Sequence, residues 1–94
     1  MKIRNFVHKG LKKLYLEDSA KGLPPDTVDK LRAMLTFLQD MPDAEKLRAL
    51  PLWKAHQLTG NRKGVWSLHI NRNWRLTFQI KGGEILDVDC EDYH

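Results

Sequence analysis

The stretch VWSLHINRNWRLTFQI, residues 65–80, decides the fold that we predict for this chain. On both sides of a polar turn at residues 71–73, large apolar side chains alternate with smaller or polar ones. Because period-two alternation indicates a strand with one buried and one wetter face, the stretch predicts an antiparallel hairpin. Arg75, Thr77 and Gln79 then lie on the wetter face of the second strand.

A third strand is expected after the next turn, which contains two glycines. A strict two-residue turn would set Phe78 opposite Asp87, which is a poor partner for a buried ring. One additional residue in the loop, or a bulge, sets Phe78 opposite Val88 and Ile80 opposite Leu86. Because register follows the buried face, we predict a three-residue loop or a bulge at this turn.

The same register brings reactive side chains to one face of the sheet. It sets Arg75 opposite Glu91, with Tyr93 on the same face one step further along. The sequence Asp92-Tyr93-His94 places an acid, a phenol and an imidazole side by side. All three side chains are suited to proton transfer. We therefore interpret this sequence as one edge of an active site.

The first half of the chain predicts two helices. Residues 3–7 are β-prone, and a helix follows from residue 8 or 9 to about residue 20. A second helix begins with Asp26 as its N-cap and carries an apolar stripe at spacings of three and four. The members of this stripe are Val28, Leu31, Met34, Leu35, Leu38 and Met41.

The segment between these helices and the hairpin has little regular structure of its own. A short helical turn at residues 43–50, capped by Asp43, precedes a loop at residues 51–64. Helices followed by strands favour an α+β fold. We therefore predict a single α+β domain over residues 1–94. Its two N-terminal helices pack on an antiparallel, twisted sheet that ends in a three-stranded meander.

Charge and composition narrow the class of partner. The net charge of +4 and the pI of about 9.4 favour an anionic partner, with nucleic acid as the first candidate. Cys90 is the only cysteine, which excludes an internal disulfide. No apolar run is long enough to cross a membrane, and residues 1–6 lack the apolar core of a signal peptide. These features favour a cytoplasmic location without membrane contact.

Five side chains form the candidate catalytic set: His56, Arg75, Asp92, Tyr93 and His94. Metal-free RNA cleavage needs a base for the 2′-hydroxyl, an acid for the departing 5′-oxygen and a cation for the phosphate. Imidazoles and carboxylates suit the first two tasks near neutral pH, and the planar fork of arginine suits phosphate. Structural interpretations remain open for each, such as a cross-strand ion pair for Arg75 and a packed ring for Tyr93.

Two other kinds of site fit the sequence less well. A zinc site would have to use His56, Cys90, Asp92 and His94, which lack the short paired spacing of structural zinc ligands. A serine hydrolase is disfavoured because there is no Gly-x-Ser-x-Gly motif, and no glycine-rich phosphate loop is present. We therefore expect neither a metal nor another cofactor.

The chain resembles the HigB-type, or plasmid maintenance killer, toxins of the RelE/ParE superfamily of bacterial toxin–antitoxin systems. The resemblance covers nearly the whole chain. Its motifs are HKGL at residues 8–11, HQLTGNR at 56–62, GVWSL at 64–68, NWRLTF at 73–78 and EDYH at 91–94. One departure is Thr59, where family members can have a lysine that helps to bind phosphate. Lys54, Arg62 or Lys63 would have to replace its contribution.

The resemblance implies a microbial RNase fold and a ribosome-dependent endoribonuclease that cleaves mRNA and so inhibits translation. The functional positions of the family correspond to His56, Arg75, Asp92, Tyr93 and His94. We expect salt-sensitive RNA contacts from seven basic side chains. These are Lys9, Lys12, Lys13, Lys54, Arg62, Lys63 and Arg72.

The implied partners are the 70S ribosome, mRNA and a helix-turn-helix antitoxin of the HigA type, through which the toxin contacts DNA only indirectly. Three alternatives remain open at this point. The first is a gyrase-inhibiting toxin of the same fold, and the second is a non-catalytic RNA-binding module. The third is an inactive copy that keeps its site residues, because a fold alone does not establish an activity.

Overall fold

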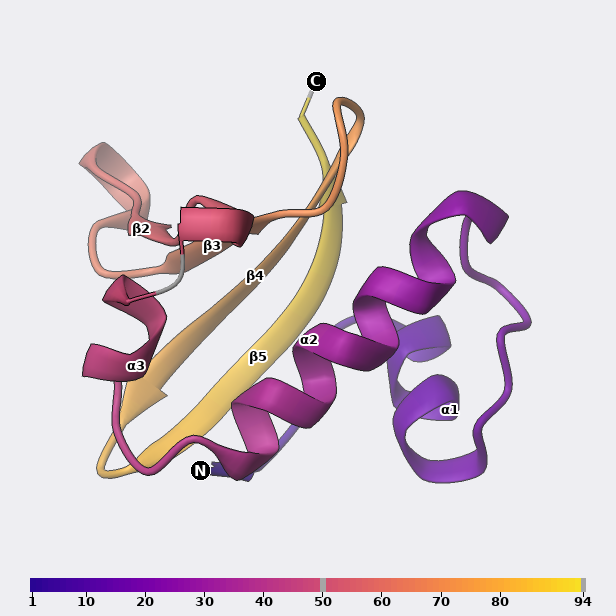
Figure 1. The fold of residues 1–94 in the computed structure, drawn as a ribbon, viewed down its shortest axis with the longest axis horizontal. Helices are drawn as coiled ribbons and strands as arrows, with labels where there is room; N and C mark the ends of the chain where they lie inside the picture. Colours follow the sequence, from indigo (N-terminus) through magenta and orange to yellow (C-terminus); the bar gives the residue numbers. More distant parts are fainter. Residues whose placement is uncertain (50, 94) are drawn as a thin grey trace.

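The computed structural model describes residues 1–49 and 51–93. Among these residues, five strands form one sheet in the order β1-β5-β4-β3-β2 (Figure 1). The strands are β1 (Lys2–Ile3), β2 (His56–Gln57), β3 (Trp66–His69), β4 (Trp74–Lys81) and β5 (Glu84–Asp92). The helices are α1 (Lys9–Glu17), α2 (Val28–Asp40) and α3 (Glu45–Arg48), with 3-10 turns at Pro25–Thr27, Pro51–Trp53 and Gly60–Arg62. The predicted α+β class is confirmed.

The sheet is mixed, so the prediction of a wholly antiparallel sheet was wrong. β1 runs parallel to β5, with Ile3 opposite Ile85, and Phe6 makes a further parallel bridge to Val88. The neighbouring pairs among β2, β3, β4 and β5 are antiparallel. β2 also lies within the segment that we predicted as a loop. Both departures depend on contacts between distant segments, which local alternation does not encode.

The register of β4 and β5 contains the extra residue that the apolar pattern requires. Arg75 lies opposite Glu91, as predicted. The glycine turn nevertheless has only two residues between the paired strand ends, and Ile80 lies opposite Ile85 rather than Leu86. The predicted three-residue loop was therefore wrong. The predicted bulge is confirmed, and it lies further along β5 than the turn.

This bulge is bound to the N-terminal segment. The pairing shifts between Thr77 and Gln79, and Asp87 has a φ of 53°. Asn5 Nδ2 donates to Asp87 Oδ1 at 2.8 Å, and Asp87 N donates to Asn5 Oδ1 at 3.1 Å. The carbonyl of Asn5 also accepts from Val88 N at 3.2 Å. Because a positive φ is costly for a residue with a Cβ atom, these bonds stabilise the bulge.

α2 supplies most of the helical core. All six residues of the predicted apolar stripe are buried, which confirms that prediction. The helix lies across one face of the sheet (Figure 1), where Leu76 and Phe78 are also buried. The predicted N-cap at Asp26 was wrong, because Asp26 lies in a 3-10 turn and α2 begins at Val28. Thr27 is the N-cap residue and makes no side-chain cap bond.

α1 is shorter than predicted because its end is set by an aspartate. It ends at Glu17, and Asp18 takes the left-handed conformation with a φ of 54°. At the other end, His8 Nδ1 accepts from the backbone N–H groups of Gly10 at 3.0 Å and Leu11 at 3.3 Å. The imidazole thus serves as an N-cap and satisfies two donors that the helix leaves unpaired.

The two faces of the sheet have different environments. Leu68, Leu76 and Phe78 point toward the helices and are fully buried. The alternate positions face the other side, which α2 does not cover. Within the part of the chain that the structure describes, no helix combines the length and apolar character needed to cross a membrane.

Candidate active site

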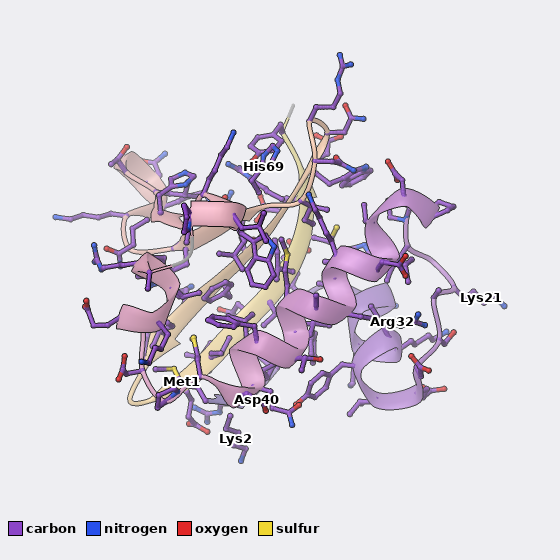
Figure 2. The ribbon with its side chains drawn as sticks, viewed as in Figure 1. Met1, Lys2, Lys21, Arg32, Asp40 and His69 are labelled. Carbon is purple, nitrogen blue, oxygen red and sulfur yellow. The ribbon has the colours of Figure 1, made fainter. Side chains whose placement is uncertain are left out.

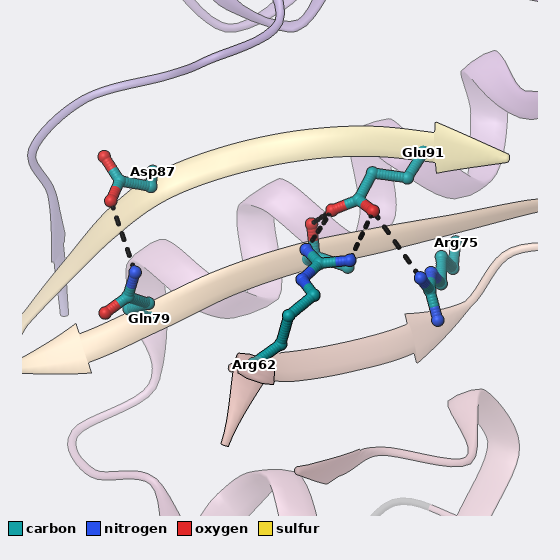
Figure 3. Close-up of polar contacts among 6 residues, drawn as sticks. Arg62, Arg75, Gln79, Asp87 and Glu91 are labelled. Atoms are coloured by element: carbon teal, nitrogen blue, oxygen red, sulfur yellow. Dashed lines mark hydrogen bonds and ion pairs between the residues drawn. The ribbon is translucent and has the colours of Figure 1, made fainter. Parts of the chain in front are cut away.

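Polar side chains from three strands share the face of the sheet opposite α2. His69 of β3 lies opposite Arg75 of β4, which lies opposite Glu91 of β5. Thr77 is two residues from Arg75 and therefore shares this face. Figure 3 shows Arg62 reaching Glu91 from the segment before β3, on the side of the strands away from the helices. The face thus gathers two arginines around one carboxylate.

Glu91 binds both arginines and a hydroxyl group (Figure 3). Arg62 Nη1 and Nη2 donate to Glu91 Oε1 and Oε2 at 2.7 and 2.5 Å. Thr77 Oγ1 also donates to Oε2, and Arg75 Nη2 lies 3.5 Å from Oε1. The hydrogen bonds from Arg62, the bond from Thr77 and the charges of both arginines outweigh burial and lower the pKa of Glu91 to about 2. Glu91 is therefore ionised at neutral pH.

Arg75 retains donor capacity on this face. Its side chain is 21% exposed, and its ion pair with Glu91 is longer than that of Arg62. Its Nε atom is buried and has no hydrogen-bond partner among the described residues. The guanidinium carbon lies 5.4 Å from the centroid of the Tyr93 ring. A partly exposed guanidinium that makes one long ion pair, and no bidentate one, suits an incoming anion such as phosphate.

Tyr93 contacts both Arg75 and His69. Its hydroxyl oxygen lies 2.9 Å from His69 Nδ1, and the two ring centroids are 5.7 Å apart at an angle of 42°. Partial burial, with smaller effects from the charges of Lys54 and Lys30, lowers the pKa of His69 from its ordinary value of 6.5. The neutral form of this imidazole therefore predominates at pH 7.

A hollow of about 300 Å³ lies beside the Arg62–Glu91 pair. Its wall also includes Thr77, Asp87 and Asp89. Burial and the neighbouring charge of Glu91 raise the pKa of Asp89. Over residues 1–49 and 51–93, no group of three or more His, Cys, Asp or Glu side chains is arranged to hold a metal ion. The hollow is thus a polar extension of the arginine site.

The sequence matches a known family over almost its whole length. The family described as RelE-like toxin of type II toxin–antitoxin system HigB matches residues 4–94. The chain is 36% identical over 92 residues to Endoribonuclease HigB of Proteus vulgaris, which covers 98% of this chain and 99% of that protein. This chain belongs to the HigB family of toxins. The resemblance identified from the sequence motifs is confirmed.

Further relatives support the family and the fold. Toxin HigB-1 of Vibrio cholerae serotype O1 is 31% identical over 84 residues, 88% of each chain. Among solved structures, YafQ from E. coli has a TM-score of 0.64 at 16% identity and covers 99% of this chain and 94% of its own. The YoeB/ParE toxin from Agrobacterium tumefaciens has a TM-score of 0.63 at 16% identity and covers 100% of both chains. These two likenesses show that this HigB toxin has the α+β fold of such toxins.

Within the described residues, the structure brings some of the predicted catalytic side chains of this HigB toxin together and places others apart. Arg75 and Tyr93 are in contact. Asp92 lies opposite Trp74, so the pleat directs it to the face opposite that of Arg75. His94 lies outside the described residues.

His56 approaches the site from the sheet edge. It begins β2 and lies opposite Ser67 of β3, whose side chain shares the face of Thr77 and Arg75. The imidazole is exposed, and its Nδ1 lies 2.9 Å from the carbonyl oxygen of Lys54. His56 is thus on the predicted face, two strands away from Arg75.

The predicted RNA-binding side chains fall into two groups. Six of them are exposed and take part in none of the contacts described above for Glu91. These are Lys9, Lys12, Lys13, Lys54, Lys63 and Arg72. Arg62 differs, because both of its terminal nitrogens donate to Glu91. Its immediate role in the structure is to fix the carboxylate.

His69, Thr77 and Glu91 belong to the site but were absent from the predicted catalytic set. Each is a polar residue directly beside an apolar or cysteine residue that is buried: His69 beside Leu68, Thr77 beside Leu76 and Phe78, and Glu91 beside Cys90. His69 and Glu91 are also the cross-strand neighbours of Arg75. Extending the predicted register by one strand, from Arg75 to β3, would have identified His69.

Proposed function

We propose that this HigB toxin is an endoribonuclease that cleaves mRNA on the ribosome by general acid–base chemistry. The observation that carries the proposal is the Arg75 guanidinium, which lies on the polar face of the sheet opposite α2, beside the Tyr93 ring and 3.5 Å from Glu91. A fixed cation on an open polar face suits the negative charge that grows on phosphate oxygens during RNA cleavage. The relative named Endoribonuclease HigB supports the same reaction class.

In the proposed reaction, Arg75 contacts the scissile phosphate. His56 and His94 are the candidates for the base that takes the 2′-hydroxyl proton and the acid that protonates the departing 5′-oxygen. Tyr93 stacks on a base. Asp92 is the candidate that orients a histidine or shares in proton transfer, and it can do so only around the end of β5, because its side chain starts from the face opposite that of Arg75. This mechanism requires no resident metal or cofactor, because the two proton transfers and the phosphate charge are each assigned to a side chain.

The partners follow from membership of a toxin–antitoxin family and from charge. A type II toxin has an antitoxin partner, and we propose that this one is a helix-turn-helix protein of the HigA type that carries the contacts with DNA. The six exposed basic side chains described above bind ribosomal RNA and mRNA through their charge. Because phosphate contacts release counterions, this binding weakens as salt is added.

Substitution of Arg75 tests the reaction. We expect Arg75→Ala to lower the rate of mRNA cleavage on 70S ribosomes by about 100-fold, as for loss of one donor to a transition-state charge. Arg75→Lys should recover only part of this loss, because a lysine keeps the charge but lacks the planar fork. The readout is mapping of mRNA 5′ ends after incubation with purified toxin and programmed ribosomes.

A matched control is Arg32→Ala. Arg32 is an arginine of α2 that pairs with Asp18 at 3.1 Å and lies on the helical side of the molecule (Figure 2). This variant should cleave like the wild type. Cleavage by Arg75→Ala at the rate of Arg32→Ala would refute the assigned role. Inhibition of DNA supercoiling without mRNA cleavage by the wild type would instead identify a gyrase-inhibiting toxin.

A further inference from the structure

We infer that His69 is a positioning residue of this site, which holds the Tyr93 phenol against Arg75 by accepting a hydrogen bond from its hydroxyl group. This inference rests on the proposed endoribonuclease function, and it adds a residue that the predicted catalytic set did not contain. The geometry that supports it lies entirely within the described residues.

The first observation is the position of His69 relative to Arg75. His69 is the last residue of β3 and lies directly opposite Arg75. Figure 2 shows it at the end of the sheet where the C-terminal segment leaves β5. Tyr93 follows Glu91 by two residues, so its side chain returns to the same face. Three strands thus bring an imidazole, a guanidinium and a phenol together.

The second observation is the set of contacts that hold the phenol. Tyr93 lies just beyond β5, and its backbone N–H donates to the carbonyl oxygen of Asn73 at 3.0 Å. Its ring is 39% exposed and lies over the Arg75 guanidinium. The hydroxyl group of this ring lies within hydrogen-bond distance of His69 Nδ1, at 2.9 Å. A partly exposed side chain retains much rotational freedom unless such a bond restricts it.

The third observation is the electrostatic environment of His69. Burial lowers the pKa of His69, and the positive charges of Lys54, from the segment before β2, and Lys30 of α2 lower it further. Arg75 faces it from β4. A neutral imidazole offers one nitrogen as an acceptor. With Nδ1 facing the Tyr93 hydroxyl group, the proton of the neutral ring belongs on Nε2.

The role of this hydrogen bond is to fix a stacking surface. The Tyr93 ring has one neighbour in the Arg75 guanidinium and one in the His69 ring. If the phenol rotates away, a base stacked on it no longer lies at a fixed distance from the phosphate that Arg75 contacts. His69 therefore acts through Tyr93 and contributes to alignment of the RNA, and it does not itself transfer a proton.

Four variants measure this role in the ribosomal cleavage assay. We expect His69→Ala and Tyr93→Phe each to lower kcat/KM by about 3- to 10-fold, the range for loss of one hydrogen bond. His69→Asn should restore activity, because its side-chain oxygen can take the place of Nδ1. The double variant of His69→Ala with Tyr93→Phe should be no worse than either single variant, because both changes remove the same bond.

Two results would overturn the inference while leaving the proposed function intact. One is wild-type activity in His69→Ala. The other is a loss in the double variant equal to the product of the two single losses, which would mean that His69 does not act through Tyr93. Thermal unfolding of each variant separates these results from a general loss of folded protein.

An NMR measurement tests the hydrogen bond even if the wild-type protein does not cleave mRNA. The ¹⁵N signals of the His69 ring should show a neutral ring with its proton on Nε2 at pH 7. Tyr93→Phe should shift the Nδ1 signal, and Arg32→Ala should not. Absence of cleavage by the wild type would refute the proposed function, and an unchanged Nδ1 signal in Tyr93→Phe would refute the inference about His69.

Discussion

Neutralising Glu91 by Glu91→Gln should destabilise the protein at neutral pH. The Arg62 hydrogen bonds, with help from Thr77 and Arg75, lower the pKa of Glu91 from 4.5 to about 2. A shift of this size corresponds to about 3 kcal/mol of preference for the ionised form in the folded state. Because the Arg62 side chain is 42% exposed, solvent screens the interaction. We therefore expect a loss of about 1–2 kcal/mol in the free energy of unfolding.

The effect should depend on pH in a defined direction. The folded-state pKa of Glu91 lies below the unfolded-state value, so its stabilisation is fully present above pH 4.5 and is lost as the pH falls through about 2. The difference between wild type and Glu91→Gln should thus be constant near neutral pH. It should shrink to about half by pH 3, because the wild-type carboxylate becomes protonated preferentially in the unfolded chain.

Urea denaturation followed by tryptophan fluorescence at several pH values measures this difference. Glu45→Gln is the matched control, because Glu45 pairs with Arg48 at 3.7 Å but its side chain is 80% exposed. An exposed pair of this kind contributes little to stability. If Glu91→Gln is as stable as the wild type at pH 7, or if the difference does not change between pH 7 and pH 3, the reasoning about this carboxylate is wrong.

Two further predictions concern the core and the helix cap. Gly10→Ala should lower stability by about 1–3 kcal/mol in the same denaturation assay, because the added Cβ would lie 2.9 Å from His8 Cε1 and 3.0 Å from the Gly22 carbonyl oxygen; an unchanged midpoint would show that the cap adjusts freely. The Cys90 thiol should react with a thiol reagent much more slowly in the folded than in the urea-unfolded protein at pH 8. Its pKa is raised to about 11 by burial and by the charges of Asp89 and Glu91, and equal rates would contradict this protection.

The sheet register was predictable because alternation reports directly on burial. The apolar residues of β3, β4 and β5 required Arg75 to lie opposite Glu91, and it does. The pattern also required one extra residue between the paired ends of β4 and β5. It did not determine where along the strands that residue lies. That place is set by Asn5, whose side chain and carbonyl bind the bulge from 82 residues away in the sequence. A hydrogen bond over such a separation leaves no periodic signal in either segment.

The helix ends were less predictable than the helix cores. The apolar stripe of α2 identified its buried face correctly, because packing of one helix face requires apolar residues at spacings of three and four. The ends depend on single side chains with several possible roles. Asp18 ends α1 before the predicted end at about residue 20, and His8 caps its start with a ring nitrogen. Both residues belong to types whose role at a helix end depends on the surrounding backbone.

The sequence also could not predict which arginine pairs with Glu91. The chain has 16 lysine and arginine residues, and composition alone does not show which of them contacts Glu91. The fold selects Arg62, whose 3-10 turn places both terminal nitrogens on the carboxylate, and leaves Arg75 with the longer contact. Had the short bidentate pair formed with Arg75, the guanidinium best placed beside Tyr93 would have been neutralised. Because Arg62 takes that position instead, Glu91 makes only a longer contact with Arg75 and leaves its Nε without a partner among the described residues, which agrees with the proposed contact between Arg75 and phosphate.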